Sequence, residues 1–349
     1  MVDYTLYLPP MLNLFSTRVP VYYVILGVIL SAFLSYTLLH SRPVALPGSA
    51  GPSASANLNG SVCSYNLPRL AGYHFVHPLM FAEPNCESEK YAPLKERIQQ
   101  EIESLRGEGV ITDASVYVCD FDEEAWISIN EQEKFSPGSL LKVPVLITYL
   151  RMSEETPRLL DQRLIAPGHD NSLPVPEYKS KSIVPGQGYT IRELLRYMIA
   201  YSDNDATNLL MSRLTDAEYL KTFTDFGLPA PEKGKVYPVS AKAFSVYMNV
   251  LYDGGYLTFA NSDYAISLLS QSEFTEGIVK GVPETVKVAH KYGEWGEGDS
   301  RELHETAIIY MNRSPYLLTI MTRGHDTQKL SEALSSISKI TYDDMERNN

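Results

Sequence analysis

Three groups of polar residues occur in an order that suits chemistry on a carbonyl group. Ser139 and Lys142 stand at the start of an apolar stretch, a Ser-Asp-Asn run follows at 202–204, and a Lys-Tyr-Gly run comes last at 291–293. A serine with an amine one helical turn away can become a nucleophile, a second hydroxyl can relay a proton, and a second amine can hold an anion. These residue types predict acyl transfer through a serine ester.

Ser139 and Lys142 are expected at the start of a buried helix. A Pro-Gly pair at 137–138 breaks the chain, and residues 140–147 are nearly all apolar, which is typical of a helix that crosses the centre of a domain. Ser139 would then lie where free N–H groups and the helix dipole stabilise negative charge, with Lys142 on the same face. Burial lowers the pKa of a lysine, so Lys142 is a candidate base for the Ser139 hydroxyl.

The two later groups supply candidate relay and binding residues. Ser202 is assigned as the hydroxyl relay and Asn204 as an amide that binds substrate, whereas Asp203 is interpreted as structural. Lys291 lies near a strand end, where it would fix a carboxylate, and Gly293 would let a substrate backbone approach closely.

Each group also has a purely structural interpretation. Ser139 is an ordinary residue for a helix N-cap, the 202–204 run is typical of a break between two helices, and Lys291 could be an exposed lysine at a strand end. The Ser-x-x-Lys spacing recurs by chance at Ser336 and Lys339, within an amphipathic pattern that gives no sign of a buried site.

The elements that must position these residues follow from hydrophobic periodicity. Strand patterns occur near both ends of the main domain, and the stretch between them is mostly helical. This arrangement predicts an α/β (α+β) fold with a mainly antiparallel sheet built from both chain ends, flanking helices and an all-helical insertion. The expected strands are 114–121, 124–130, 285–292, 305–312 and 315–324, and the expected helices are 91–106, 140–152, 190–202, 206–214, 240–254 and 326–345.

Composition excludes several classes of function. The net charge is −12, which argues against nucleic acid as a partner because phosphate binding needs a basic face. There is no Gly-rich nucleotide motif and no cluster with zinc-ligand spacing, so no cofactor and no metal are predicted. Cys63 and Cys86 flank the start of the folded region and would pair if the domain is exported, but the sequence leaves the pairing open; Cys119 is expected as a buried thiol.

The N-terminal region is predicted to anchor the chain. Residues 19–39 carry no charge and as a helix would extend about 32 Å, enough to cross a hydrocarbon core of about 30 Å. The rival interpretation is a cleavable signal peptide with a small-x-small site at 54–56. The prediction is a single-pass protein of the cell membrane that contacts the lipid bilayer through 19–39, with its catalytic domain outside the cytoplasm. The predicted divisions are an N-terminal tail at 1–18, the anchor at 19–39, a flexible linker at 40–62, an irregular lead-in at 63–89 and a serine hydrolase domain at 90–349.

The order and spacing of the three groups resemble those of the class A β-lactamases, within the penicillin-recognising serine enzymes. The resemblance covers roughly residues 90–345, and it includes the segments YTIRELLRYMIAYSDNDATNLL and AIIYMNRSPYLLTIMTRG. It implies a β-lactamase/transpeptidase-like fold and a β-lactam or peptidoglycan peptide as substrate. It also implies that the backbone N–H groups of Ser139 and Glu294 form the oxyanion hole. The implied side-chain roles are Ser139 as nucleophile, Lys142 as base, Ser202 as proton relay, and Asn204, Lys291, Tyr292 and Gly293 as substrate-binding residues.

Two departures from the family pattern bear on activity. Tyr292 stands where the family has Thr or Ser, so carboxylate binding is expected to change. The family also carries a Glu-x-x-x-Asn element whose Glu positions the hydrolytic water. Between Ser202 and Lys291 no Glu has Asn four residues later, and the segment 226–240, where that loop should fall, is short and contains Glu232. The other glutamates in that interval are Glu218, Glu273, Glu276 and Glu284.

Acylation is therefore expected to survive, while rapid release of the acyl group is in question. Three hypotheses follow: a β-lactamase-like hydrolase, a peptidoglycan D,D-peptidase or penicillin-binding enzyme with slow deacylation, and a non-catalytic anchored wall-binding protein. The retained Ser139, Lys142, Ser202, Asn204 and Lys291 argue against the third.

Overall fold

The computed structural model describes residues 63–168, 177–178, 180–311 and 314–348. Within these residues, five strands form one antiparallel sheet in the order β4-β3-β9-β8-β7. Two of the strands come from the first part of the domain and three from the last, so the predicted sheet of both chain ends is confirmed. The strands are β3 (Asp113–Asp120), β4 (Ala125–Ile129), β7 (Lys287–Glu297), β8 (Ser300–Tyr310) and β9 (Tyr316–Gly324).

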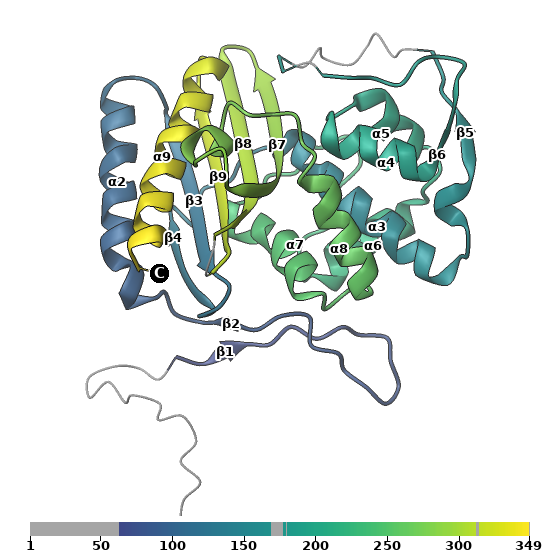
Figure 1. Cartoon of the computed structure of the whole chain (residues 1–349), viewed down its shortest axis with the longest axis horizontal. Coiled ribbons are helices and arrows are strands. Elements are labelled where there is room, and N and C mark those ends of the chain that lie inside the picture. The colour runs from purple at the N-terminus through teal and green to yellow at the C-terminus, as the bar shows by residue number, and fades with distance from the viewer. Residues whose placement is uncertain (1–62, 169–176, 179, 312–313, 349) are drawn as a thin grey trace, which may run out of the picture. The chain divides into compact units, whose positions relative to one another are not determined.

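Helices cover both faces of this sheet (Figure 1). On one face pack α2 (Ala92–Gly107) and α9 (Thr327–Asn348), and the remaining helices gather on the other side. The predicted helical insertion is confirmed, with two helices that the pattern missed, α6 and α8. Its helices are α3 (Lys142–Glu155), α4 (Ile191–Ala200), α5 (Asn204–Met211), α6 (Asp216–Asp225), α7 (Ala241–Asp253) and α8 (Phe259–Leu269).

The core lies in two clusters, one on each side of the sheet. Strand β3 shows why, because its side chains alternate between the faces. Val116 and Val118 pack with α2 and α9, whereas Tyr117 and Cys119 pack with the helical insertion. The Cys119 thiol is free and buried, as predicted.

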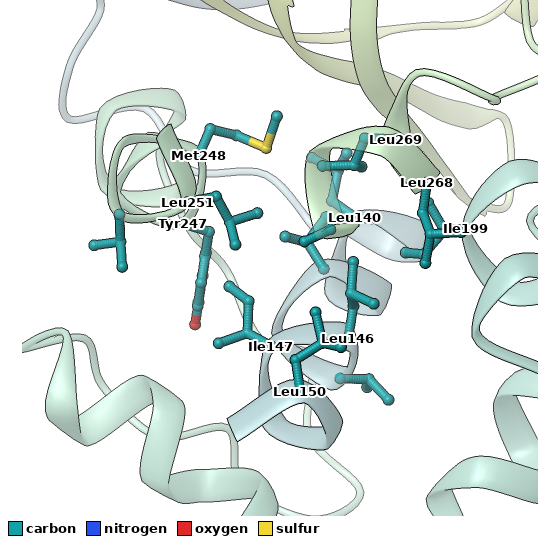
Figure 2. Packing of buried hydrophobic residues seen from close by; sticks show 14 of the residues in the cluster. Leu140, Leu146, Ile147, Leu150, Ile199, Tyr247, Met248, Leu251, Leu268 and Leu269 are labelled. Atoms are coloured by element: carbon teal, nitrogen blue, oxygen red, sulfur yellow. The ribbon is translucent and has the colours of Figure 1, made fainter. Parts of the chain in front are cut away.

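Helix α3 runs through the middle of the insertion, as its apolar sequence predicted. Every residue from Lys142 to Leu150 is buried. Figure 2 shows Leu146 and Ile147 of α3 between the side chains of α7 on one side and those of α4 and α8 on the other. This packing fixes the helix that begins with the Ser139–Lys142 pair.

Short elements complete the described residues. The lead-in segment carries a disulfide between Cys63 and Cys86, which settles the pairing that the sequence left open. Two pairs of short strands lie outside the main sheet. They are β1 (Tyr65–Asn66) with β2 (Glu83–Pro84), and β5 (Arg163–Ile165) with β6 (Gly188–Thr190); the 3₁₀ turns are η1 (Glu89–Tyr91), η2 (Gly138–Leu141), η3 (Leu159–Asp161) and η4 (Ile278–Gly281).

The predicted membrane location is corrected. Residues 19–39, proposed as the anchor, lie outside the described residues, as do the predicted tail at 1–18 and the linker at 40–62. Within the part that the structure describes, no helix combines the length and the apolar character needed to cross a bilayer. Helix α9 is long enough at 22 residues, but charged side chains such as Lys339 and Asp343 make it amphipathic. The predictions of a membrane protein and of contact with lipid are therefore not retained.

Candidate active site

The candidate nucleophile lies in a tight turn that leads into α3. Gly138 has a positive φ of 53°, and η2 continues through Ser139 before α3 begins at Lys142. No side chain caps η2 or α3, so Ser139 does not act as an N-cap. The Ser139 side chain is half-buried, and the Lys142 side chain is buried.

Lys142 reaches the loop between α4 and α5. Its Nζ donates to the Ser202 carbonyl at 2.6 Å, to Ser202 Oγ at 3.1 Å and to Asn204 Oδ1 at 2.8 Å. Burial lowers the pKa of Lys142 to about 7, although the negative charges of Asp203 and Glu294 act in the opposite direction. An amine with a pKa near neutrality is partly unprotonated at physiological pH and can accept a proton.

The loop that carries Ser202 has a strained backbone. Ser202 is buried and has a φ of 53°, a conformation that residues other than glycine rarely adopt. Asp203 holds the loop, because its carboxylate accepts from the N–H of Ile183 at 2.9 Å and from that of Asp205 at 3.1 Å. The predicted structural role of Asp203 agrees with these contacts.

Lys291 approaches the same hydroxyl from β7. Its Nζ donates to Ser202 Oγ at 2.8 Å and to the Tyr292 carbonyl at 2.8 Å, and its side chain is fully buried. Burial, and secondarily the nearby charge of Lys142, lower the pKa of Lys291. Ser202 Oγ therefore lies between two buried amines, which is an arrangement able to pass a proton from one side to the other.

The ring of Tyr292 is held by packing. It stacks on Phe274 with 4.3 Å between ring centroids, and Lys291 Nζ lies 4.2 Å from its centroid. The hydroxyl of Tyr292 donates to the Tyr178 carbonyl at 3.0 Å. The ring and the hydroxyl of this residue, predicted to bind substrate, thus have partners within the protein.

Two glycines let β7 pack directly on η2. A Cβ added to Gly293 would lie 2.3 Å from the Pro137 carbonyl oxygen, and one added to Gly138 would lie 2.3 Å from the Glu294 carbonyl oxygen. Real side chains do not tolerate such distances, so this contact requires glycine on both segments. The backbones of Ser139 and Glu294, whose N–H groups are the predicted oxyanion hole, consequently belong to adjoining segments.

Residues of β8 hold the turn before Ser139, the candidate nucleophile. The Ser136 N–H donates to Glu302 Oε2 at 2.7 Å, and His304 Nε2 donates to the Ser136 carbonyl at 3.0 Å. Arg323 Nε in turn donates to Glu302 Oε1 at 2.8 Å. The sequence analysis missed these residues, because the alternation of β8 alone does not show which segment its buried charges face.

The side chain of Glu294 is a second feature that sequence reasoning missed. Only its backbone N–H was assigned a role. Its charge acts on both Lys142 and Lys291, and one carboxylate oxygen accepts from the Glu177 N–H at 3.2 Å. Burial raises the pKa of Glu294, while the two lysines act to lower it. An acidic residue directly after the Lys-Tyr-Gly run was the available signal.

Three of the glutamates between Ser202 and Lys291 have other partners. Glu232 lies at the surface and pairs with Lys235 at 2.5 Å. Glu218 caps α6 through Thr215, and Glu273 pairs with Lys181 at 2.7 Å.

Comparison with known proteins places these residues in a wider context. Residues 93–345 match the model of the family described as "Beta-lactamase enzyme family". A curated relative, Beta-lactamase 1 of Streptomyces cacaoi, is 26% identical over 240 residues, which cover 61% of this chain and 72% of the relative.

Solved structures with the same fold include two kinds of protein. A PBP-A variant, described as an acyl-enzyme complex with penicillin G, is 22% identical with a TM-score of 0.62 and covers 73% of this chain and 97% of its own. A β-lactamase from Chitinophaga pinensis is 16% identical with a TM-score of 0.63 and covers 72% of this chain and 99% of its own. The predicted β-lactamase/transpeptidase-like fold is confirmed.

Proposed function

The chain belongs to the beta-lactamase enzyme family, and we propose that it is an active-site-serine hydrolase that forms an acyl-enzyme at Ser139 with a β-lactam or a related amide. One observation carries the proposal: Ser202 Oγ lies between the amines of Lys142 and Lys291, at 3.1 Å and 2.8 Å. A buried cluster of two lysines around one hydroxyl is costly to maintain, since each charge loses its hydration. Such a cost is typical of a site that moves protons.

The proposed reaction begins at the Ser139 hydroxyl. Neutral Lys142 accepts its proton as Oγ attacks the amide carbonyl carbon, and backbone N–H groups of Ser139 and Glu294 stabilise the oxyanion. The carbon–nitrogen bond then breaks, and the proton reaches the leaving nitrogen through Ser202. The products are an ester on Ser139 and an amine, which stays attached to the acyl group when the substrate is a β-lactam and leaves when it is an open-chain amide. Lys291 holds Ser202 Oγ and contributes positive charge for an anionic group of the substrate.

A second candidate function is a D,D-peptidase or penicillin-binding enzyme that releases its acyl group slowly. The observation that favours it is the surface position of Glu232, the one glutamate in the segment where the family carries its water-activating residue. In this candidate, acylation proceeds as above and the ester persists. The PBP-A variant captured with penicillin G supports such chemistry on this fold.

Intact mass spectrometry of the full chain with benzylpenicillin tests the proposal. We expect an adduct of one drug mass on the native protein and none on the Ser139→Ala variant. Loss of the adduct, with accumulation of hydrolysed drug, identifies a β-lactamase; a persistent adduct identifies a penicillin-binding enzyme. Absence of an adduct on the native protein, both with benzylpenicillin and with a D-alanyl-D-alanine thioester probe, would overturn the proposal and favour a non-catalytic binding protein.

A further inference from the structure

Glu294 holds a carboxylate oxygen that has no use in the acylation step. The residue follows Gly293 on β7, and Oε2 accepts from the Glu177 N–H at 3.2 Å. Oε1 is buried and has no hydrogen-bond partner among the described residues. A buried carboxylate oxygen without a partner loses hydration without recovering a hydrogen bond, so its position calls for an explanation.

The other acidic group that acts on Lys142 is already engaged. The carboxylates whose charge acts on Lys142 are Asp203 and Glu294. Asp203 accepts hydrogen bonds through both of its oxygens, from the N–H groups of Ile183 and Asp205. Of these two carboxylates, Glu294 is therefore the one with an oxygen that lacks a hydrogen-bond partner among the described residues.

Glu294 is also close to the nucleophile along the backbone. Its carbonyl oxygen lies 2.3 Å from the place that a Cβ on Gly138 would occupy, and Gly138 directly precedes Ser139. The carboxylate thus extends from a residue that adjoins the nucleophile turn. The hydrogen bond from the Glu177 N–H engages Oε2 and leaves Oε1 without a partner among the described residues.

We infer that Glu294 is the general base for release of the acyl group, an inference that rests on the proposed acyl-enzyme at Ser139. Oε1 holds a water molecule and accepts one of its protons as the water oxygen attacks the ester carbonyl carbon. The carbon–oxygen bond to Ser139 then breaks, and the same proton passes to Ser139 Oγ. One water is consumed, a carboxylic acid leaves, and the enzyme returns to its starting state.

The electrostatic setting suits this role. Burial raises the pKa of Glu294, which makes its carboxylate a stronger base than an exposed one, and the charges of Lys142 and Lys291 oppose complete loss of ionisation. General bases of this kind contribute about 10²–10⁴-fold to a rate. Glu294→Gln is nearly isosteric, and its amide oxygen can still accept from the Glu177 N–H.

The test separates acylation from release in the full chain. Protein is acylated with excess benzylpenicillin, freed of drug by rapid gel filtration, and followed by intact mass. We expect Glu294→Gln, which keeps its backbone N–H, to form the adduct and, once acylated, to lose it at least about 10²-fold more slowly than the native protein. Hydroxylamine, a nucleophile that needs no base, should restore release. Glu232→Gln, the matched control in the segment 226–240, should release the acyl group at the native rate.

Several results would overturn the inference. These are release from Glu294→Gln at the native rate, persistence of the adduct only in Glu232→Gln, and a native adduct that is never lost. The proposed function survives all three, because it fails only when no Ser139-dependent adduct forms. If Glu294→Gln does not fold, Glu294→Asp replaces it: the shorter carboxylate should slow release by about 10²-fold, since misplacement by about 1 Å has that effect, and a native rate would refute the role.

Discussion

Acylation of Ser139 should depend on pH through the neutral fraction of Lys142. The pKa of Lys142 is about 7 because burial disfavours its charged form. A base with this pKa is about 50% neutral at pH 7 and about 1% neutral at pH 5, so the acylation rate constant should fall about 50-fold between those two values. Above the pKa the rate should level off, because further loss of protons adds little neutral amine.

The assay is quench-flow acylation by benzylpenicillin, read as intact mass in buffers from pH 5 to pH 9. Two variants test the assignment of the rising limb to Lys142. Lys142→Arg should abolish acylation at every pH, because a guanidinium stays protonated. Glu294→Gln should move the midpoint to lower pH, because the negative charge that it removes raises the pKa of Lys142.

Three results would refute this reasoning. A rate that is constant from pH 5 to pH 8 would mean that Lys142 does not titrate in this range or does not act as the base. Acylation of Lys142→Arg at a rate near that of the native protein would exclude Lys142 as the proton acceptor at any pH. A shift of the midpoint to higher pH in Glu294→Gln would contradict the electrostatic coupling between the two residues.

The remaining predictions concern packing and stability. Gly293→Ala should lower the acylation rate at least tenfold and reduce the melting temperature, because its Cβ would lie 2.3 Å from a backbone oxygen, whereas Gly107→Ala, with open space around its Cβ, should change neither. Reduction of the Cys63–Cys86 bond, whose cysteines are 23 residues apart, should destabilise the fold by roughly 3 kcal/mol in chemical denaturation and leave acylation unchanged. Burial opposes ionisation of Glu302, but its contacts with His304, Arg323 and the Ser136 N–H outweigh burial and lower its pKa below the ordinary 4.5. The ionised carboxylate should therefore stabilise the fold at neutral pH, and this contribution should be lost on acidification below about pH 4.5. Melting temperatures across pH 3–7 should show a smaller fall in Glu302→Gln.

Equal acylation of Gly293→Ala and the native protein would show that β7 and the nucleophile turn need no close contact. A melting temperature unaffected by reductant would contradict the role of the disulfide. An identical acid response in Glu302→Gln would mean that other carboxylates account for the pH dependence.

Much of the fold was predictable because its elements have strong periodic patterns. The alternation at 113–120 and the apolar run that becomes α3 each suit one kind of element, and the structure has those elements. Helices α6 and α8 were missed. The first half of β8 was also missed, since its charged residues at 301–305 do not resemble a strand whose side chains are buried. The partners of these charged residues come from distant segments of the chain, and sequence patterns do not show which segments meet.

The sequence identified most residues of the candidate site, but it did not show how their side chains contact one another. The sequence analysis named Lys142, Ser202, Asn204 and Lys291, and the structure brings these four together. The same strand alternation would place Tyr292 and Glu294 on one face. Strand alternation cannot show that the Tyr292 ring stacks on Phe274, because Phe274 lies in a loop that precedes β7.

The pairing of β3 with β9 has a consequence for the order in which the protein assembles during synthesis. Asp113 pairs with Arg323, so the centre of the sheet cannot close until the chain has been made as far as β9. A nascent chain that ends before β7 already contains Ser139, Lys142 and Ser202, but it lacks Lys291 and the strand against which the nucleophile turn packs. We expect such an unfinished chain not to react with acyl donors, so that reactivity arises only after β7, β8 and β9 have been made.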